Sequence, residues 1–105
     1  MKLPGRGEVW WGEAPDTKGR PYLVLTRDEA IPVLRTVLVA PITRTIRGIP
    51  TEVTLGADEG LPTACVAAFD TTTVFPRAML VRRVGSLSPI RIHELCDALA
   101  AVTDC

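Results

Sequence analysis

Two polar residues, Arg20 and Thr43, stand at the ends of short apolar runs and could act together on one anion. Arg20 precedes the run at 22–25, and Thr43 closes the run at 37–42. Short runs rich in Val, Leu and Ile and bounded by turn residues are typical of buried β-strands. If the two strands pair, a guanidinium and a hydroxyl meet at one rim of a sheet, and arginine matches phosphate oxygens as a bidentate fork. We therefore predict a phosphate-binding pair at this rim.

The charged residues are sorted along the sequence, although the formal net charge is zero. Residues 18–47 carry six basic side chains against two acidic ones, whereas residues 48–70 carry four acidic side chains and no base. Charge runs are usually solvated faces, but segregation of this kind can also guide a polyanion such as a nucleic acid. The balanced total argues only against wholesale charge neutralisation of the histone type. The basic residues that flank the predicted rim are Lys18, Arg27, Arg44 and Arg47.

The cysteines and the single histidine do not form a metal-binding pattern. Cys65, Cys96 and Cys105 include no CxxC pair, and His93 is the only histidine. Zinc sites need several such ligands at short spacing, and secreted disulfide scaffolds are dense in cysteine with even counts. We therefore expect no metal and no other cofactor, and we interpret His93 as structural.

Composition indicates one folded domain covering residues 1–105. Hydrophobic residues make up 47% of the chain and charged residues 23%, which is typical of a globular protein. The chain shows neither an apolar run long enough to cross a bilayer nor the parts of a signal peptide. We expect a cytoplasmic protein without a membrane partner.

Short strands at close spacing account for most of the chain, and the only substantial helix comes last. Ser88 and Pro89 suit the N-cap and first position of that helix, which we expect to run to about Ala101. This order predicts a mainly β fold with a C-terminal helix, arranged as a small SH3-like antiparallel β-barrel. The expected apolar stripe of the helix is Ile92, Leu95, Cys96, Leu99 and Val102. The expected strands are 6–11, 20–26, 36–43, 51–55, 63–69 and 80–85, with loops at 12–19, 27–35, 44–50 and 56–62.

Several segments, in order, resemble the signatures of the MazF/PemK (Kid) toxins. Residues 6–10 resemble the family's RG(D/E)(V/I) opening, residues 19–25 its RPVLV strand, and residues 39–43 its strand ending in (P/A)(I/V)T. Residues 49–53 and 66–70 resemble two later strands of the family. The resemblance therefore covers nearly the whole chain.

The resemblance implies the toxin of a type II toxin–antitoxin system, with a CcdB-like barrel, a homodimeric state and neutralisation by a MazE-like antitoxin. It also implies a metal-independent, sequence-selective endoribonuclease of the mRNA interferase type that cleaves single-stranded RNA. In that reaction a 2′-hydroxyl attacks the adjacent phosphorus and leaves a 2′,3′-cyclic phosphate and a 5′-hydroxyl. Such a step needs a base or polariser for the 2′-hydroxyl, cationic stabilisation of the phosphorane and an acid for the leaving oxygen.

On this resemblance Arg20, Thr43 and Asp70 are the catalytic residues. Arg20 would stabilise the phosphorane and donate a proton, Thr43 would bind the phosphate, and Asp70 would be the general base of Kid-type members. The chain departs from the Kid pattern because Ala68 replaces an arginine and loop 12–19 lacks a histidine. The alternative for Asp70 is a helix- or turn-capping role. The expected RNA-binding residues are Lys18, Arg27, Arg44 and Arg47.

Trp10 and Trp11 are adjacent, so on a strand they face opposite sides. One should enter the core, and the other could stack on a nucleobase or on an antitoxin side chain. The sequence leaves open which tryptophan is buried.

Two other functions stay open from the residues. One is a non-enzymatic poison of the same fold, similar to CcdB, which binds DNA gyrase, and the other is an SH3-like interaction module. The Arg20–Thr43 pair favours the nuclease, because a gyrase binder would not require it. The cleavage motif and the class of target RNA depend on the shapes of loops 12–19 and 44–50, which the sequence does not give.

Overall fold

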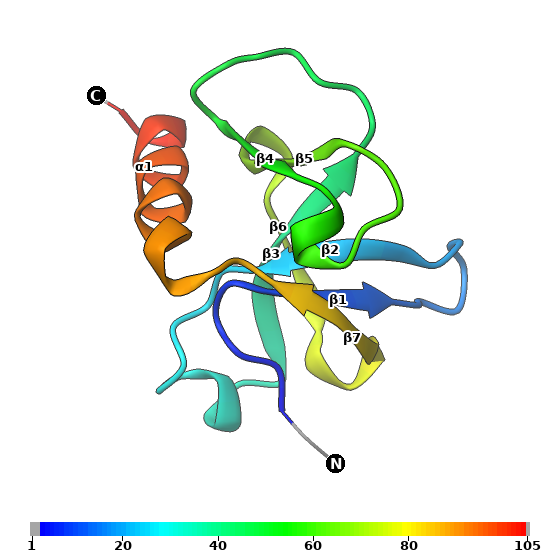
Figure 1. Ribbon diagram of the computed structural model, residues 1–105. Coiled ribbons are helices and arrows are strands. Elements are labelled where there is room, and N and C mark those ends of the chain that lie inside the picture. Colours follow the sequence, from blue (N-terminus) through cyan, green and yellow to red (C-terminus); the bar gives the residue numbers. More distant parts are fainter. Residues whose placement is uncertain (1–2, 105) are drawn as a thin grey trace.

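The computed structural model describes residues 3–104, in which seven strands precede one α-helix (Figure 1). The helix is α1 (Ile92–Val102). The strands are β1 (Glu8–Gly12), β2 (Arg20–Val24), β3 (Thr36–Thr43), β4 (Glu52–Leu55), β5 (Cys65–Ala68), β6 (Thr73–Pro76) and β7 (Leu80–Ser86). Short 3₁₀ turns lie between them: η1 (Ile31–Val33), η2 (Ala57–Glu59), η3 (Phe69–Thr71), η4 (Arg77–Met79) and η5 (Pro89–Arg91).

Strand β3 is the centre of the sheet. The strand order is β4-β5-β3-β2-β1-β7. One edge of β3 is shared by two strands: β6 pairs with its first half, and β5 pairs with its last two residues. The pairings are antiparallel, and the sheet curls into a half-barrel with α1 beside it (Figure 1). The prediction of a small, mainly β, antiparallel barrel with a C-terminal helix is therefore confirmed.

Both faces of the central strands β2 and β3 are largely covered, which explains why these two strands contain nearly continuous apolar runs. Neighbouring residues on a strand point to opposite faces, so Val9 and Leu23 enter one core cluster while Trp10 and Val24 enter the other. The first cluster also holds Phe69 and the buried residues of α1. Trp10 is thus the buried tryptophan, with 6% of its surface exposed.

The C-terminal helix differs from the prediction in its start and in its buried stripe. Ser88 precedes η5 and Pro89 begins it, but the Ser88 side chain makes no capping hydrogen bond, and α1 begins only at Ile92. The buried stripe is Leu95 and Ala98, with Ile92 and Leu99 partly buried. Cys96 and Val102 are exposed, so their assignment to the apolar stripe was wrong. Cys96 lies one residue, or about 100° of turn, from Leu95 and so leaves the stripe.

Strand β6 was not predicted. It is four residues long, ends in Pro76 and pairs only with β3 in the part of the chain that the structure describes. Proline is tolerated at such an edge because no further strand needs its missing N–H. Across residues 3–104, no helix has the length and apolar character that crossing a membrane requires.

Candidate active site

The pairing of β2 with β3 brings Arg20 and Thr43 to the same end of the sheet. Tyr22 pairs with Pro41, so two residues further along this register Arg20 and Thr43 come level with each other. The Arg20 Nη2 donates a hydrogen bond of 2.9 Å to the carbonyl oxygen of Ile42, which fixes the guanidinium along this rim. The structure therefore places the two residues as the strand ends indicated.

The Arg20 and Thr43 side chains both keep groups that can bind an anion. The guanidinium lies 5.8 Å from the centre of the Tyr22 ring, and its bond to Ile42 uses only one of its five N–H donors. The Thr43 hydroxyl oxygen accepts from the backbone N–H of Thr45 at 3.2 Å. Because that bond uses an acceptor position, the Thr43 hydroxyl proton can still be donated to a phosphate oxygen.

Two adjoining grooves share the Arg20–Thr43 rim. One, of about 400 Å³, extends between Trp11 and the segment 60–63, and we call it the Trp11 groove. The other, of about 520 Å³, extends over Lys18, and we call it the Lys18 groove. The residues common to both linings are Gly19, Arg20, Ile42, Thr43 and Arg44.

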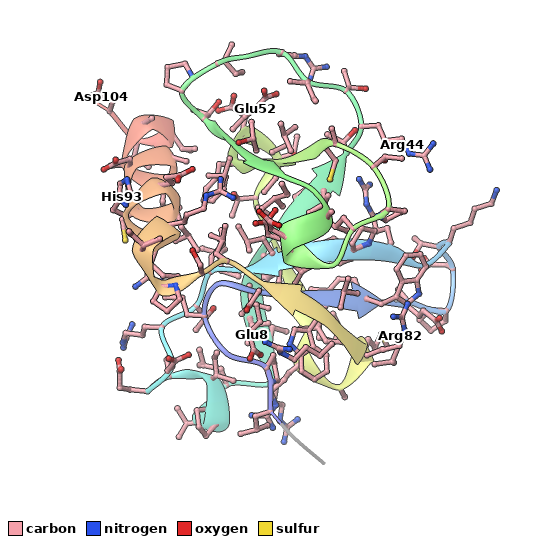
Figure 2. All side chains as sticks on the ribbon, viewed as in Figure 1. Glu8, Arg44, Glu52, Arg82, His93 and Asp104 are labelled. Carbon is pink, nitrogen blue, oxygen red and sulfur yellow. The ribbon has the colours of Figure 1, made fainter. Side chains whose placement is uncertain are left out.

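Both grooves are basic. Among the described residues that line them there is no carboxylate, whereas Lys18, Arg20, Arg44 and Arg82 all contribute. Figure 2 shows Arg44 and Arg82 on the same side of the molecule, away from His93 on α1. His93 is exposed, and its Nδ1 lies 2.9 Å from the carbonyl oxygen of Ile90. This arrangement suits an extended anion rather than a cation.

The structure does not bring Asp70 to this rim. Thr43 pairs with Val66 of β5, whereas Asp70 lies beyond the end of β5, in η3. The Asp70 Oδ2 accepts a hydrogen bond of 2.7 Å from the Thr51 hydroxyl, and Asp70 lines neither groove. The contact links η3 to the segment entering β4, and η3 has no side-chain capping hydrogen bond.

The four expected RNA-binding residues separate into two pairs. Lys18 lines the Lys18 groove and Arg44 lines both grooves. Arg27 lies beyond the opposite end of β2, 4.0 Å from the Glu29 carboxylate, and lines a different hollow. Arg47 lies in the loop before β4, where its backbone N–H donates to Glu52 at 3.0 Å, and it lines neither groove. Only Lys18 and Arg44 therefore lie beside Arg20.

Sequence reasoning did not find Arg82. In the sheet Trp11 pairs with Arg82 of β7, and the Arg82 guanidinium carbon lies 5.9 Å from the centre of the Trp11 ring. The sequence shows only two successive arginines on a terminal strand, and no local signal separates Arg82 from Arg83. The pairing of two strands about seventy residues apart is what brings Arg82 to the groove.

Among the described residues that line the Trp11 groove, Cys65 is the one thiol, and it is buried. Burial, and secondarily the charge of Glu59, raise the pKa of this thiol. A thiol with a raised pKa stays protonated at neutral pH and is a poor nucleophile. Within residues 3–104 no three His, Cys, Asp or Glu side chains lie where they could hold a metal ion together.

The fold and the rim define a class of protein: a small curled β-barrel with a basic edge. A family model described as "PemK-like, MazF-like toxin of type II toxin-antitoxin system" matches residues 5–103. The chain therefore belongs to this family of toxins, as the resemblance indicated.

Individual relatives agree with this assignment. "Probable endoribonuclease MazF5" of Mycobacterium tuberculosis (strain ATCC 25618 / H37Rv) is 47% identical over 105 residues, covering 98% of this chain and 95% of that protein. "Probable endoribonuclease MazF2" of the same strain is 44% identical over 101 residues, covering 95% of this chain and 98% of that protein. The solved "Mycobacterium tuberculosis toxin MazF-mt6" superposes with a TM-score of 0.84 at 36% identity, covering 92% of this chain and 96% of that one. A solved "Endoribonuclease in complex with its cognate antitoxin from Mycobacterial species" gives a TM-score of 0.82 at 26% identity, covering 95% and 94%.

Proposed function

We propose that this toxin is a sequence-selective endoribonuclease that cleaves single-stranded RNA without a metal ion. The observation that carries the proposal is the Arg20 guanidinium beside Thr43 at a rim from which two basic grooves extend. Relatives named endoribonucleases support it over a CcdB-like gyrase poison and over an inert interaction module.

In the proposed reaction, the 2′-hydroxyl of a nucleotide attacks the adjacent phosphorus and loses its proton to solvent water. The bond from phosphorus to the 5′-oxygen of the next nucleotide breaks, and this oxygen takes a proton from solvent to become the 5′-hydroxyl. The Arg20 fork binds the non-bridging oxygens, whose negative charge increases in the phosphorane. The Thr43 hydroxyl donates a hydrogen bond to an oxygen of the same phosphate. Donors that are fixed before the reaction stabilise such a transition state more than the ground state.

The described lining of the grooves offers no carboxylate or imidazole as a general base. The catalysis that the geometry supports is therefore orientation of the 2′-hydroxyl and electrostatic stabilisation of the phosphorane. Asp70 is left out of the proposed catalytic set because of its position near Thr51. Lys18 and Arg44 hold the RNA backbone next to the cleaved phosphate.

We further propose that residues 1–105 act as one domain, as a homodimer in the cytoplasm, and that a MazE-like antitoxin holds it inactive. The support is the family's place in type II toxin–antitoxin systems and the solved relative in complex with its cognate antitoxin. Sedimentation of the purified toxin, alone and with the product of a neighbouring small gene, tests both partners.

The nuclease proposal is tested by incubating the purified toxin with single-stranded RNA in excess chelator. We expect discrete fragments with 2′,3′-cyclic phosphate and 5′-hydroxyl ends, and sequencing of the new 5′ ends gives the cleavage motif. Arg20→Ala should slow cleavage by roughly 100-fold or more, as loss of a transition-state donor does. Thr43→Val should slow it by a smaller factor, because a neutral donor contributes less than a charged one.

The matched control is Arg27→Ala, which removes the same charge from the opposite end of β2 and should cleave like the wild type. Arg20 is exposed, so its loss should leave the circular dichroism spectrum and the melting temperature unchanged. Intact RNA in the wild-type reaction, or equal activity of Arg20→Ala, would overturn the proposal. Intact RNA together with inhibited gyrase supercoiling would favour the CcdB-like alternative.

A further inference from the structure

The Trp11 groove differs chemically from the Lys18 groove. Its walls include the Trp11 indole, Pro62 and Val84, whereas the Lys18 groove is lined chiefly by polar and basic side chains of its loop and rim. The Tyr22 ring of the Lys18 groove is buried and lies below the Arg20 guanidinium. A flat apolar group can therefore pack against an aromatic ring in the Trp11 groove but not in the Lys18 groove.

The Trp11 indole is held in place from two directions. Its Nε1 donates a hydrogen bond of 3.0 Å to the Glu13 carboxylate. The ring also packs so closely on Gly19 that a Cβ at that position would lie under 3.0 Å from three indole atoms. Gly19 thus allows the indole to lie against the backbone directly before Arg20, and the half-buried ring is a fixed wall rather than a mobile side chain.

Arg82 adds a cation to the same wall. Its guanidinium lies 5.9 Å from the centre of the Trp11 ring, and no described carboxylate forms an ion pair with it. Its neighbour Arg83, in contrast, donates to Glu8 at 3.1 Å and does not line the groove. Arg82 therefore keeps its charge and its N–H donors for a ligand of the groove.

We propose that the Trp11 groove is a nucleobase subsite for a nucleotide next to the cleaved phosphate, with Trp11 and Arg82 as the residues that contact the base. This inference rests on the proposed function. A ligand that combines a flat apolar ring with negative charge suits a groove whose described lining has a tryptophan, three arginines and no carboxylate. The volume of about 400 Å³ lies within the range of roughly 300–1,000 Å³ of small-molecule sites.

The position of the groove supports this subsite. It shares Arg20 and Thr43 with the rim, so a base attached to a phosphate bound there enters the groove without an intervening nucleotide. On the Lys18 side the RNA is held chiefly by its backbone. Selectivity for sequence therefore arises mainly on the Trp11 side, since base contacts specify and phosphate contacts only position.

Steady-state cleavage of a pentanucleotide centred on the mapped cleavage site tests the subsite. Trp11→Ala and Arg82→Ala should each raise KM by about ten-fold while kcat stays within about three-fold, a size typical of a lost stacking contact. Trp11→Phe retains a ring and should stay within about three-fold of the wild type in KM. Arg83→Ala is the matched control for Arg82→Ala on the same strand and should leave KM unchanged.

A substrate lacking one base separates recognition from a general loss of stability. Removing the base that occupies the subsite should raise the wild-type KM by about ten-fold, and Trp11→Ala should then add no further increase. The nucleotide before and the nucleotide after the cleaved phosphate are each made abasic in a separate substrate. For one of these two substrates, the wild-type KM should rise and Trp11→Ala should cause no further increase. An unchanged KM in Trp11→Ala, or an equal further loss on both abasic substrates, would overturn the subsite.

A binding measurement keeps this inference distinguishable from the nuclease proposal. Homopolymeric RNA pentanucleotides of A, C or U, with 2′-O-methyl groups that prevent cleavage, should quench tryptophan fluorescence in the wild type and not in Trp11→Phe. Quenching without any cleavage of unmodified RNA would support the subsite and defeat the nuclease proposal. Cleavage of RNA, with neither fluorescence quenching nor a change of KM in Trp11→Ala, would support the nuclease proposal and overturn the subsite.

Discussion

At the scale of single residues, the Arg20 guanidinium is fixed by a backbone carbonyl rather than by a carboxylate. The bond from Nη2 to the Ile42 oxygen orients the planar group, and the described residues provide no ion-pair partner that would offset its charge. An arginine paired with an acid would lose part of its attraction for a phosphate. The geometry therefore suits Arg20 to an external anion more than to a structural ion pair.

A substitution of Asp70 tests whether this residue is catalytic, as the resemblance implies, or serves only the contact with Thr51. Asp70→Asn should leave the cleavage rate within about two-fold of the wild type, because the carboxylate lines neither groove and accepts from Thr51. An asparagine oxygen can still accept that bond, so the free energy of unfolding should fall by less than about 1 kcal/mol. Cleavage assays over pH 5 to 9 and urea unfolding measure the two quantities. A loss of activity of 100-fold or more without unfolding would return Asp70 to the catalytic set.

The residues of the rim could be predicted from the sequence because each is marked by its own strand end. Arg20 opens one apolar run and Thr43 closes the next, and antiparallel neighbours place such ends together. Nothing local marks Arg82, whose position depends on the pairing of β7 with β1. The position of Asp70 could not be predicted, because a likeness in sequence order does not give the register of β5 against β3.

At the scale of elements, Glu8 ties the N-terminal segment and β1 to β7. Its Oε1 accepts from the Gly5 backbone N–H at 2.7 Å and from the Trp10 indole at 3.0 Å, and its Oε2 accepts from Arg83 at 3.1 Å. Burial acts to raise the pKa of the Glu8 carboxyl. The hydrogen bonds from Trp10, Gly5 and Arg83, together with the charge of Arg83, outweigh burial and lower this pKa below its ordinary value of 4.5.

Acid should therefore weaken this connection. Since the folded pKa of Glu8 is lowered, its stabilising contribution is fully present above about pH 4.5 and is lost as the pH falls through the lower folded value. Glu8→Gln should lower the free energy of unfolding by roughly 1–2 kcal/mol at pH 7. The difference from the wild type should shrink as the pH falls below 4.5. Urea unfolding of both proteins from pH 3 to 7 measures it, and a difference independent of pH would contradict the assignment.

A second ion pair connects η2 to the start of α1. Glu59 is the only charged residue among the buried side chains of the described chain, at 5% exposure, and its Oε2 accepts from Arg91 at 3.1 Å. Its Oε1 accepts from the Gly56 N–H at 2.7 Å, and Arg91 also donates to the Thr54 carbonyl oxygen at 2.7 Å. The segment 60–63 that follows η2 forms one wall of the Trp11 groove, so this pair also supports the site.

Removing the Glu59 charge should therefore destabilise the fold. Glu59→Gln should lower the free energy of unfolding by roughly 2–3 kcal/mol, because it leaves Arg91 partly buried without this partner. The control is Asp58→Asn, an exposed neighbour whose change should stay within about 0.5 kcal/mol. Thermal and urea unfolding measure both variants. If both variants lowered the free energy of unfolding by an equally small amount, the ion pair of Arg91 with Glu94 would be sufficient to stabilise the guanidinium.

The sequence predicted most elements but not the environment of this pair. Residues 56–62 were expected to be an acidic loop, and the structure forms η2 within them, with Glu59 buried. The composition of an acidic segment does not show whether one of its carboxylates binds an arginine distant in sequence or is hydrated. Strand β6 escaped prediction for a related reason, since a four-residue edge strand is decided by its partner β3 rather than by its own pattern.

At the scale of the whole molecule, the formal net charge is zero, but the edge of the sheet at the Arg20–Thr43 rim is basic. Lys18, Arg20, Arg44 and Arg82 line the two grooves, while Arg27 lies at the opposite end of β2. A single-stranded polyanion should respond to this local field rather than to the total charge, because exposed charges beyond about 10 Å are largely screened at moderate salt.

The salt dependence of RNA binding tests this view. For single strands, the logarithm of the binding constant falls with the logarithm of salt concentration with a slope of about −0.7 for each neutralised phosphate. Lys18→Ala and Arg44→Ala should each reduce the magnitude of that slope by about 0.7, because each removes one phosphate contact. Arg27→Ala changes the net charge by the same amount and should leave the slope unaltered. Fluorescence anisotropy of a 2′-O-methyl RNA between 50 and about 300 mM salt measures it. An equal change in all three variants would mean that the total charge, and not the rim, governs how this toxin holds RNA.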